Sequence, residues 1–113
     1  MIKIYHNPRC KKSRVGLKYL EEKGVDFEIV EYLKNPLTEE ELKDILIKMN
    51  IEPIDIIRTQ EEVYRKQFKG KNFTNNEWVK ILVENPKLLK RPIVVKNYKA
   101  VWADPPENLD EML

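Results

Sequence analysis

Alternating apolar and polar residues at the beginning of the chain predict a strand that leads into a helix. Residues 2–4 alternate as in a half-buried strand, and the Asn7-Pro8 pair is typical of a turn. A helical pattern follows and ends at Gly24, a residue suited to the left-handed backbone beyond a helix end. Residues 25–29 alternate again. The first thirty residues therefore predict a β-α-β unit.

The middle of the chain has helical periodicity. Residues 38–41 fit a capping box and precede apolar residues at i, i+3, i+4 and i+7 spacing. The same capping pattern recurs at residues 74–77. Between these two segments, residues 60–68 predict a shorter helix that ends at Gly70.

The last third returns to a strand pattern. Residues 93–95 are a short β-branched run, Asn97 can turn the chain, and residues 98–102 form a second run. Together they predict an antiparallel hairpin. Residues 104–107 then begin a final helix.

The predicted order is β-α-β, helices, β-β-α, with Cys10 after the first strand and a proline immediately before the third. This is the thioredoxin-like plan, an α/β fold with a four-stranded mixed sheet and a helical insertion. We expect a single domain, residues 1–113, whose insertion covers about residues 38–86.

Composition narrows the class of protein. The chain has 113 residues, 42% hydrophobic and 35% charged, with a net charge of +2, which fits one soluble domain and gives no indication of nucleic-acid binding. No apolar run is long enough for a membrane span or resembles a signal peptide, so we expect a cytoplasmic protein. One cysteine and one histidine exclude a disulfide framework and a zinc cluster.

The single cysteine, Cys10, lies at the predicted start of the first helix. Basic residues flank it on both sides: Arg9, Lys11, Lys12 and Arg14. Their charge, the unpaired N–H groups and the helix dipole all favour a thiolate, which is the nucleophilic form. A lone cysteine can instead be a small buried hydrophobic residue. The surrounding charge favours an anion-attracting nucleophilic site.

Three segments resemble the glutaredoxin-linked arsenate reductase family. Residues 5–14, Tyr-His-Asn-Pro-Arg-Cys-Lys-Lys-Ser-Arg, are similar to the active-site loop of that family. The family also has an Arg-Pro-Ile-Val-Val segment, found here at residues 91–95. It has a further arginine a short way before a tyrosine, which here are Arg58 and Tyr64. The resemblance covers essentially the whole chain.

The resemblance implies a reaction. The Cys10 thiolate would attack arsenate or a similar oxyanion, glutathione would attack the adduct, and glutaredoxin would help to release arsenite. The chain has no second cysteine, which agrees independently with an external thiol. The resemblance thus implies no bound cofactor, an external thiol as co-substrate and glutaredoxin as a partner. We also expect a monomer.

Polar residues of the same loop gain roles from the resemblance. The family has a histidine at the position of His6, which makes His6 a catalytic candidate beside Cys10. We expect His6 to stabilise the thiolate and not to act as a general base; the alternative is a loop residue satisfied by backbone groups. Ser13 could donate to the sulfur or only solvate the first helical turn. Arg14 could contact the oxyanion or only the surface.

Arg58 and Arg91 are the candidates for binding the oxyanion. A guanidinium is always charged and offers paired donors that match arsenate or phosphate oxygens. Each arginine could instead form a surface ion pair, because acidic residues are plentiful. If the Arg91-Pro92 peptide is cis, as the thioredoxin-like plan implies, the Pro92 turn would aim this backbone at the sulfur.

Asp104 departs from the pattern of the family. Members with a third anion-binding arginine have it at this place, before a proline. A carboxylate there would repel an oxyanion. Either Asp104 points away and caps the last helix, which we favour because Asp ahead of Pro-Pro-Glu is a good helix start, or the substrate differs.

Two other functions compete with arsenate reduction. One is a related thiol enzyme that acts on a glutathione mixed disulfide. The other is a regulator of the Spx type that binds a partner such as polymerase. Position 13 is serine, so the chain lacks the Cys-x-x-Cys pair used by such regulators. The regulator is therefore the least favoured of the three.

Overall fold

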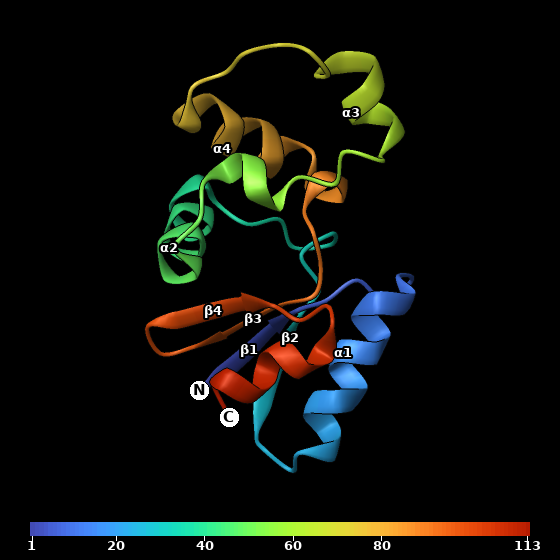
Figure 1. Ribbon diagram of the computed structural model, residues 1–113, viewed down its shortest axis with the longest axis vertical. Coiled ribbons are helices and arrows are strands. Elements are labelled where there is room, and N and C mark those ends of the chain that lie inside the picture. Colours follow the sequence, from blue (N-terminus) through green and yellow to red (C-terminus); the bar gives the residue numbers. More distant parts are fainter. The chain divides into compact units, whose positions relative to one another are not determined.

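A mixed four-stranded sheet forms the centre of one of two units in the computed structural model, which describes residues 1–113 (Figure 1). Unit 1 comprises Met1–Asn35 and Arg91–Leu113, and unit 2 comprises Pro36–Lys90.

Unit 1 has the predicted element order. Its elements are β1 (Ile2–Tyr5), α1 (Lys11–Glu22), β2 (Phe27–Val30), β3 (Ile93–Lys96), β4 (Lys99–Trp102) and the 3₁₀ helix η3 (Pro106–Glu111). The strand order is β2-β1-β3-β4. β1 pairs in parallel with β2 and antiparallel with β3, and β3 pairs antiparallel with β4. The prediction of a thioredoxin-like α/β fold with a four-stranded mixed sheet is confirmed.

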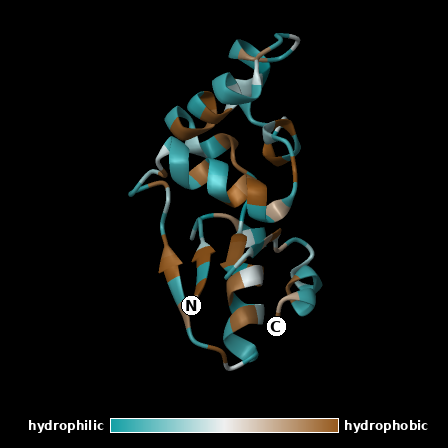
Figure 2. Ribbon diagram, turned by 90° about the vertical axis from the view of Figure 1, so that its left-hand side faces the viewer, coloured by the Kyte–Doolittle hydropathy of each residue, from teal (hydrophilic) through white to brown (hydrophobic).

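The core of unit 1 lies between the sheet and its helices. Ile4 of β1, Leu20 of α1, Val94 of β3 and Leu109 of η3 are all fully buried in one cluster. Apolar and polar residues alternate in bands along the elements, as burial on one side requires (Figure 2). β2 is an edge strand that begins at Phe27, later than the pattern predicted, and its Ile29 is exposed.

Unit 2 is helical. Its elements are α2 (Glu39–Met49), η1 (Pro53–Ile56), α3 (Glu62–Gln67), α4 (Asn75–Glu84) and η2 (Pro86–Leu88). Both predicted capping boxes are present: the Thr38 and Thr74 hydroxyls each accept from the N–H three residues on, and the glutamate there accepts from the threonine N–H. α3 is shorter than residues 60–68, and Gly70 follows it with φ +77°.

The last element differs from the prediction. Residues 106–111 form a 3₁₀ helix whose N-cap is Pro105, and no side chain caps it. The expectation that Asp104 caps this helix is therefore wrong. Two consecutive prolines move the first turn one residue further on, and the Asp104 carboxylate instead pairs with Nζ of Lys12 at 3.1 Å.

Candidate functional site

The loop between β1 and α1 holds Cys10 at the N-cap of α1. The Cys10 N–H donates to the carbonyl oxygen of Asn7 at 3.0 Å, and the Cys10 carbonyl accepts from the Arg14 N–H at 3.0 Å. The Asn7 side-chain oxygen accepts from the Arg9 N–H at 3.0 Å, which closes the turn that the Asn7-Pro8 pair predicted. The thiol is thus fixed at the first turn of the helix.

The start of α1 is strongly positive. No acidic residue lies in its first turn, and Lys11 and Lys12 occupy the first two helical positions. Acidic residues are the ones that stabilise a helix N-terminus, so this arrangement sacrifices helix stability. It concentrates positive potential at Cys10 and favours an anion there.

The groups around Cys10 lower the pKa of its thiol. Partial burial acts to raise the pKa, but hydrogen bonding from the backbone N–H of Ser13 opposes it. The hydrogen bond and charge of the Arg91 side chain, and the N–H of Lys12, also lower the pKa. The net result lies below the ordinary value. Cys10 makes no capping hydrogen bond of ordinary geometry, so we attribute the effect to several weaker contacts acting together.

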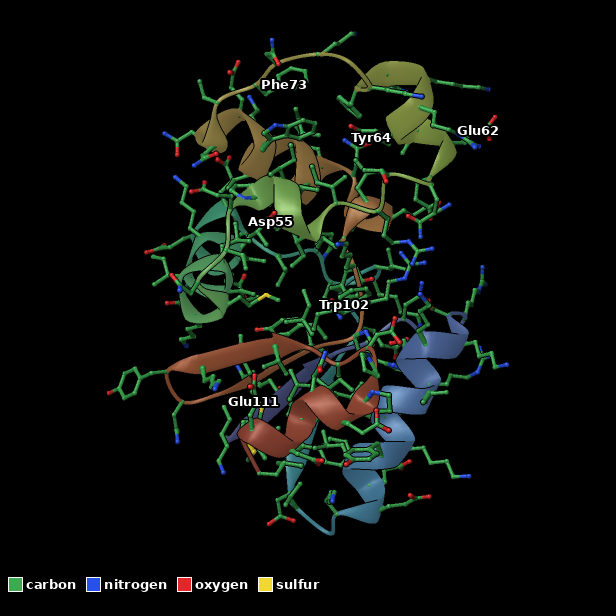
Figure 3. All side chains as sticks on the ribbon, in the orientation of Figure 1. Asp55, Glu62, Tyr64, Phe73, Trp102 and Glu111 are labelled. Atoms are coloured by element: carbon green, nitrogen blue, oxygen red, sulfur yellow. The ribbon has the colours of Figure 1, made fainter.

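Arg91 is held in place by the end of β4. Its carbonyl oxygen accepts from Nε1 of Trp102 at 3.1 Å (Trp102 is labelled in Figure 3), and only 8% of Arg91 is exposed. The Arg91–Pro92 peptide is cis, as the thioredoxin-like plan implied. The Pro92 carbonyl accepts from the Ala103 N–H at 2.9 Å.

Gly16 allows α1 to approach this turn. A Cβ atom at position 16 would lie 2.6 Å from Cγ of Pro92 and 3.4 Å from the carbonyl oxygen of Ala103. The first contact is closer than real Cβ atoms come. The second turn of α1 therefore packs directly on the segments that carry Arg91 and Trp102.

His6 and Ser13 form a buried hydrogen-bonded pair behind the loop. Oγ of Ser13 accepts from the Asn7 N–H at 3.0 Å and lies 2.7 Å from Nδ1 of His6. Burial lowers the pKa of His6, with a smaller lowering from Arg14 and an opposing effect of Glu31. We infer a neutral ring that accepts the Ser13 hydroxyl proton. His6 is not among the groups that shift the pKa of Cys10.

Arg14 also supports the loop: its Nη1 donates to the Pro8 carbonyl oxygen at 3.0 Å. Arg58 belongs to unit 2. Its Nε pairs with Oε1 of Glu61 at 3.5 Å, its side chain is 17% exposed, and its N–H donates to the Leu88 carbonyl at 2.7 Å.

Unit 1 by itself thus brings together most of the predicted site residues: His6, Cys10, Ser13, Arg14, Arg91 and Pro92. Arg58 is described with unit 2, to which it belongs. The sequence reasoning missed Trp102, because its bond to Arg91 depends on the pairing of β3 with β4, where Ile93 lies opposite Trp102. It also treated Lys12 only as a nearby charge.

No group of three or more His, Cys, Asp or Glu residues could hold a metal ion. No helix is both long enough and apolar enough to cross a membrane.

The fold and the site define a thioredoxin-like protein with one activated thiol at a helix start. Residues 5–112 match the ArsC family, and the chain belongs to that family. An arsenate reductase of Neisseria meningitidis serogroup A is 40% identical over 99% of this chain and 97% of that protein. YfgD of Escherichia coli K12, described as uncharacterized, is 39% identical over 99% of this chain and 96% of YfgD. The structure of an arsenate reductase from Vibrio cholerae superposes with a TM-score of 0.94 at 36% identity, covering 99% of this chain and 97% of that one.

Proposed function

We propose that this protein is an arsenate reductase that uses an external thiol, with Cys10 as its nucleophile. The observation that carries the proposal is that Cys10 is the N-cap of the positive start of α1, where the Arg91 side chain lowers the pKa of its thiol. That arrangement stabilises a thiolate and offers donors to an oxyanion at the same point. Relatives that align over nearly the whole chain carry the name arsenate reductase.

In the proposed reaction the Cys10 thiolate attacks arsenic, an S–As bond forms, and an arsenate oxygen leaves as water after protonation. Reduction of As(V) to As(III) takes two electrons. Two external thiols supply them as they become a disulfide, arsenite leaves, and the Cys10 thiolate is restored. Glutathione and glutaredoxin are the proposed thiol donors, because Cys10 is the only cysteine of the chain.

Each remaining predicted residue has a proposed part. Arg91 and Arg58 bind the oxyanion, and Arg58 exchanges its contact with Glu61 for arsenate. His6 and Ser13 are positioning residues, since their hydrogen bonds hold the loop on which Cys10 lies. Arg14 and Pro92 support the same loop and the neighbouring turn.

We propose that the chain works as a monomer in the cytoplasm, a compartment in which thiols stay reduced. In this proposal residues 1–113 act as one thioredoxin-like domain, with a helical insertion at about residues 38–86.

A coupled assay with arsenate, glutathione, glutaredoxin and glutathione reductase tests the function. We expect arsenate-dependent consumption of reductant by the wild type and none by Cys10→Ser. Alkylation of Cys10 in the same preparation verifies that the thiol is intact. An absence of arsenate-dependent turnover, with Cys10 present and reactive, would reject the proposal.

Asp104 favours a second candidate, a glutathione-dependent thiol reductase that does not act on arsenate. Asp104 is the carboxylate at the place where the resemblance implies a third anion-binding arginine in some family members. If this carboxylate prevents arsenate from binding, Asp104→Arg should create or raise arsenate turnover in the same assay. No gain would remove Asp104 as the reason for a different substrate.

A further inference from the structure

Three residues with no assigned role lie beside the groups that contact the Cys10 sulfur. The N–H of Lys12 is one of the groups that lower the Cys10 pKa. The indole of Trp102 donates to the carbonyl of Arg91, whose side chain also bonds the sulfur. The close contact of Gly16 with Pro92 and Ala103 brings residues 102–104 against the first turns of α1. The third residue, Asp104, therefore lies next to the first turns of α1.

Lys12, Asp104 and Trp102 also contact one another. Nζ of Lys12 is 3.1 Å from Oδ2 of Asp104 and 5.8 Å from the centroid of the Trp102 ring. The side chains of Lys12 and Asp104 are 54% and 25% exposed. An ion pair this open to water contributes little to stability and separates at small cost. A ligand can therefore replace each partner of the pair.

The chemistry of this trio matches one kind of ligand. An ammonium next to a carboxylate, above a flat aromatic surface, complements a group that carries its own carboxylate and ammonium. An α-amino acid group has these two charges on one carbon atom. Its carboxylate would bind Lys12, its ammonium would bind Asp104, and its carbon stem would lie on Trp102.

We propose that Lys12, Asp104 and Trp102 form a subsite for a low-molecular-weight thiol that carries an α-amino acid group. This inference deepens the proposed function. It rests on that function in one respect, because the subsite requires a reactive Cys10. It also accounts for the carboxylate at position 104, because Asp104 recognises the ammonium of the thiol and leaves the oxyanion to Arg91.

Thiol–disulfide exchange at Cys10 tests the subsite without arsenate. The Cys10 thiolate attacks one sulfur of a disulfide, an S–S bond to Cys10 forms, the original S–S bond breaks, and one thiolate leaves. Three disulfides serve as probes. Glutathione disulfide has α-amino acid groups and a net negative charge, 3,3′-dithiodipropionate has carboxylates only, and 2-hydroxyethyl disulfide is neutral.

The Asp104→Asn variant distinguishes recognition of the ammonium by Asp104 from simple repulsion between Asp104 and a negatively charged disulfide. The subsite predicts that the rate with glutathione disulfide falls by about five- to tenfold, the factor expected for one lost charge-assisted hydrogen bond. The rate with dithiodipropionate should stay constant or rise, because a repelling carboxylate is gone. Lys12→Met should slow both anionic disulfides more than the neutral one, because the lost charge near Cys10 affects all three reactions but only the anionic probes lose a partner for their carboxylates.

The matched controls are Glu111→Gln and Lys99→Met. Glu111 and Lys99 form another exposed ion pair of unit 1, with Nζ of Lys99 3.7 Å from Oε1 of Glu111. Glu111 lies at the other end of η3 from Asp104 (labelled in Figure 3). Neither control should change the preference for glutathione disulfide. If Asp104→Asn speeds or leaves unchanged the reaction with glutathione disulfide, the subsite is refuted. If Cys10 reacts with none of the probes, the proposed function fails as well. Retained selectivity without arsenate turnover would support the subsite and reject only arsenate reduction.

Discussion

The helices of the two units begin in opposite ways. In unit 2, α2 and α4 each have a threonine N-cap, a complete capping box and glutamate in the first turn. In unit 1, α1 has Cys10 as its N-cap, no capping hydrogen bond and no acidic residue in the first turn. The starts of α2 and α4 are optimised for stability. The start of α1 leaves its N–H groups and positive charge to a thiol, and it is this difference that makes Cys10 a candidate nucleophile.

Cys10→Ser should turn the start of α1 toward the unit 2 type and give the largest effect. A serine hydroxyl caps a helix well but is a far weaker nucleophile than a thiolate. We expect arsenate turnover to be abolished and the free energy of unfolding to rise by up to about 1 kcal/mol. Urea denaturation and the coupled assay measure the two changes. Arsenate turnover at the wild-type rate in this variant would show that Cys10 is not the nucleophile.

The second prediction compares how much two arginines contribute to turnover, one from each unit. The variants are Arg91→Met in unit 1 and Arg58→Met in unit 2. The Arg91 side chain lowers the pKa of Cys10, whereas the charge of Arg58 is already matched by Glu61. Loss of one donor to the reacting oxyanion typically lowers kcat about 10²–10³-fold, and we expect this for Arg91. Arg58→Met should raise KM for arsenate more than it lowers kcat. A larger fall in kcat for Arg58→Met than for Arg91→Met would contradict this order.

Ser13→Ala and Thr74→Ala separate the two roles of a hydroxyl near a helix start. Ser13→Ala leaves the buried Asn7 N–H and His6 without their partner, so unfolding should become easier by about 1–3 kcal/mol. Thr74→Ala removes an exposed cap and should cost about 1 kcal/mol. Only Ser13→Ala should also slow alkylation of Cys10. Equal alkylation rates in both variants would show that the loop does not need Ser13.

The smallest effect concerns pH. Burial keeps the pKa of His6 below its ordinary value, so the unfolded chain binds this proton more readily than the folded one. The contribution of the neutral His6 ring to the free energy of unfolding is therefore fully present above pH of about 6.5. It is lost as the pH falls through the pKa of His6 in the folded protein. The free energy of unfolding should decrease between pH 7.5 and 5.5, and less so in His6→Asn. His6 is the only histidine, which keeps the assignment simple.

Local patterns predicted much of the fold. Both threonine capping boxes, the turn at Asn97 and the helix end at Gly24 depend on short-range backbone preferences, which a single sequence displays. Cys10 and its basic neighbours were visible for the same reason.

Long-range contacts were not visible. Asp104 resembled a helix cap, and nothing nearby in sequence indicates that it pairs with Lys12, ninety-two positions earlier. The Trp102 bond to Arg91 depends on strand register, and the need for glycine at position 16 depends on how α1 packs. Such contacts follow from the assembled sheet and not from a local pattern.

The central claim is that groups of unit 1 by themselves activate the Cys10 thiol, and the rate of alkylation by neutral iodoacetamide as a function of pH tests it most directly. We predict a midpoint below about 8.5, the value of an ordinary cysteine. Arg91→Met should raise the midpoint, and Arg58→Met should leave it unchanged. Of these two arginines, Arg91 alone is among the groups that lower the pKa of Cys10. A wild-type midpoint at or above about 8.5 would contradict the account.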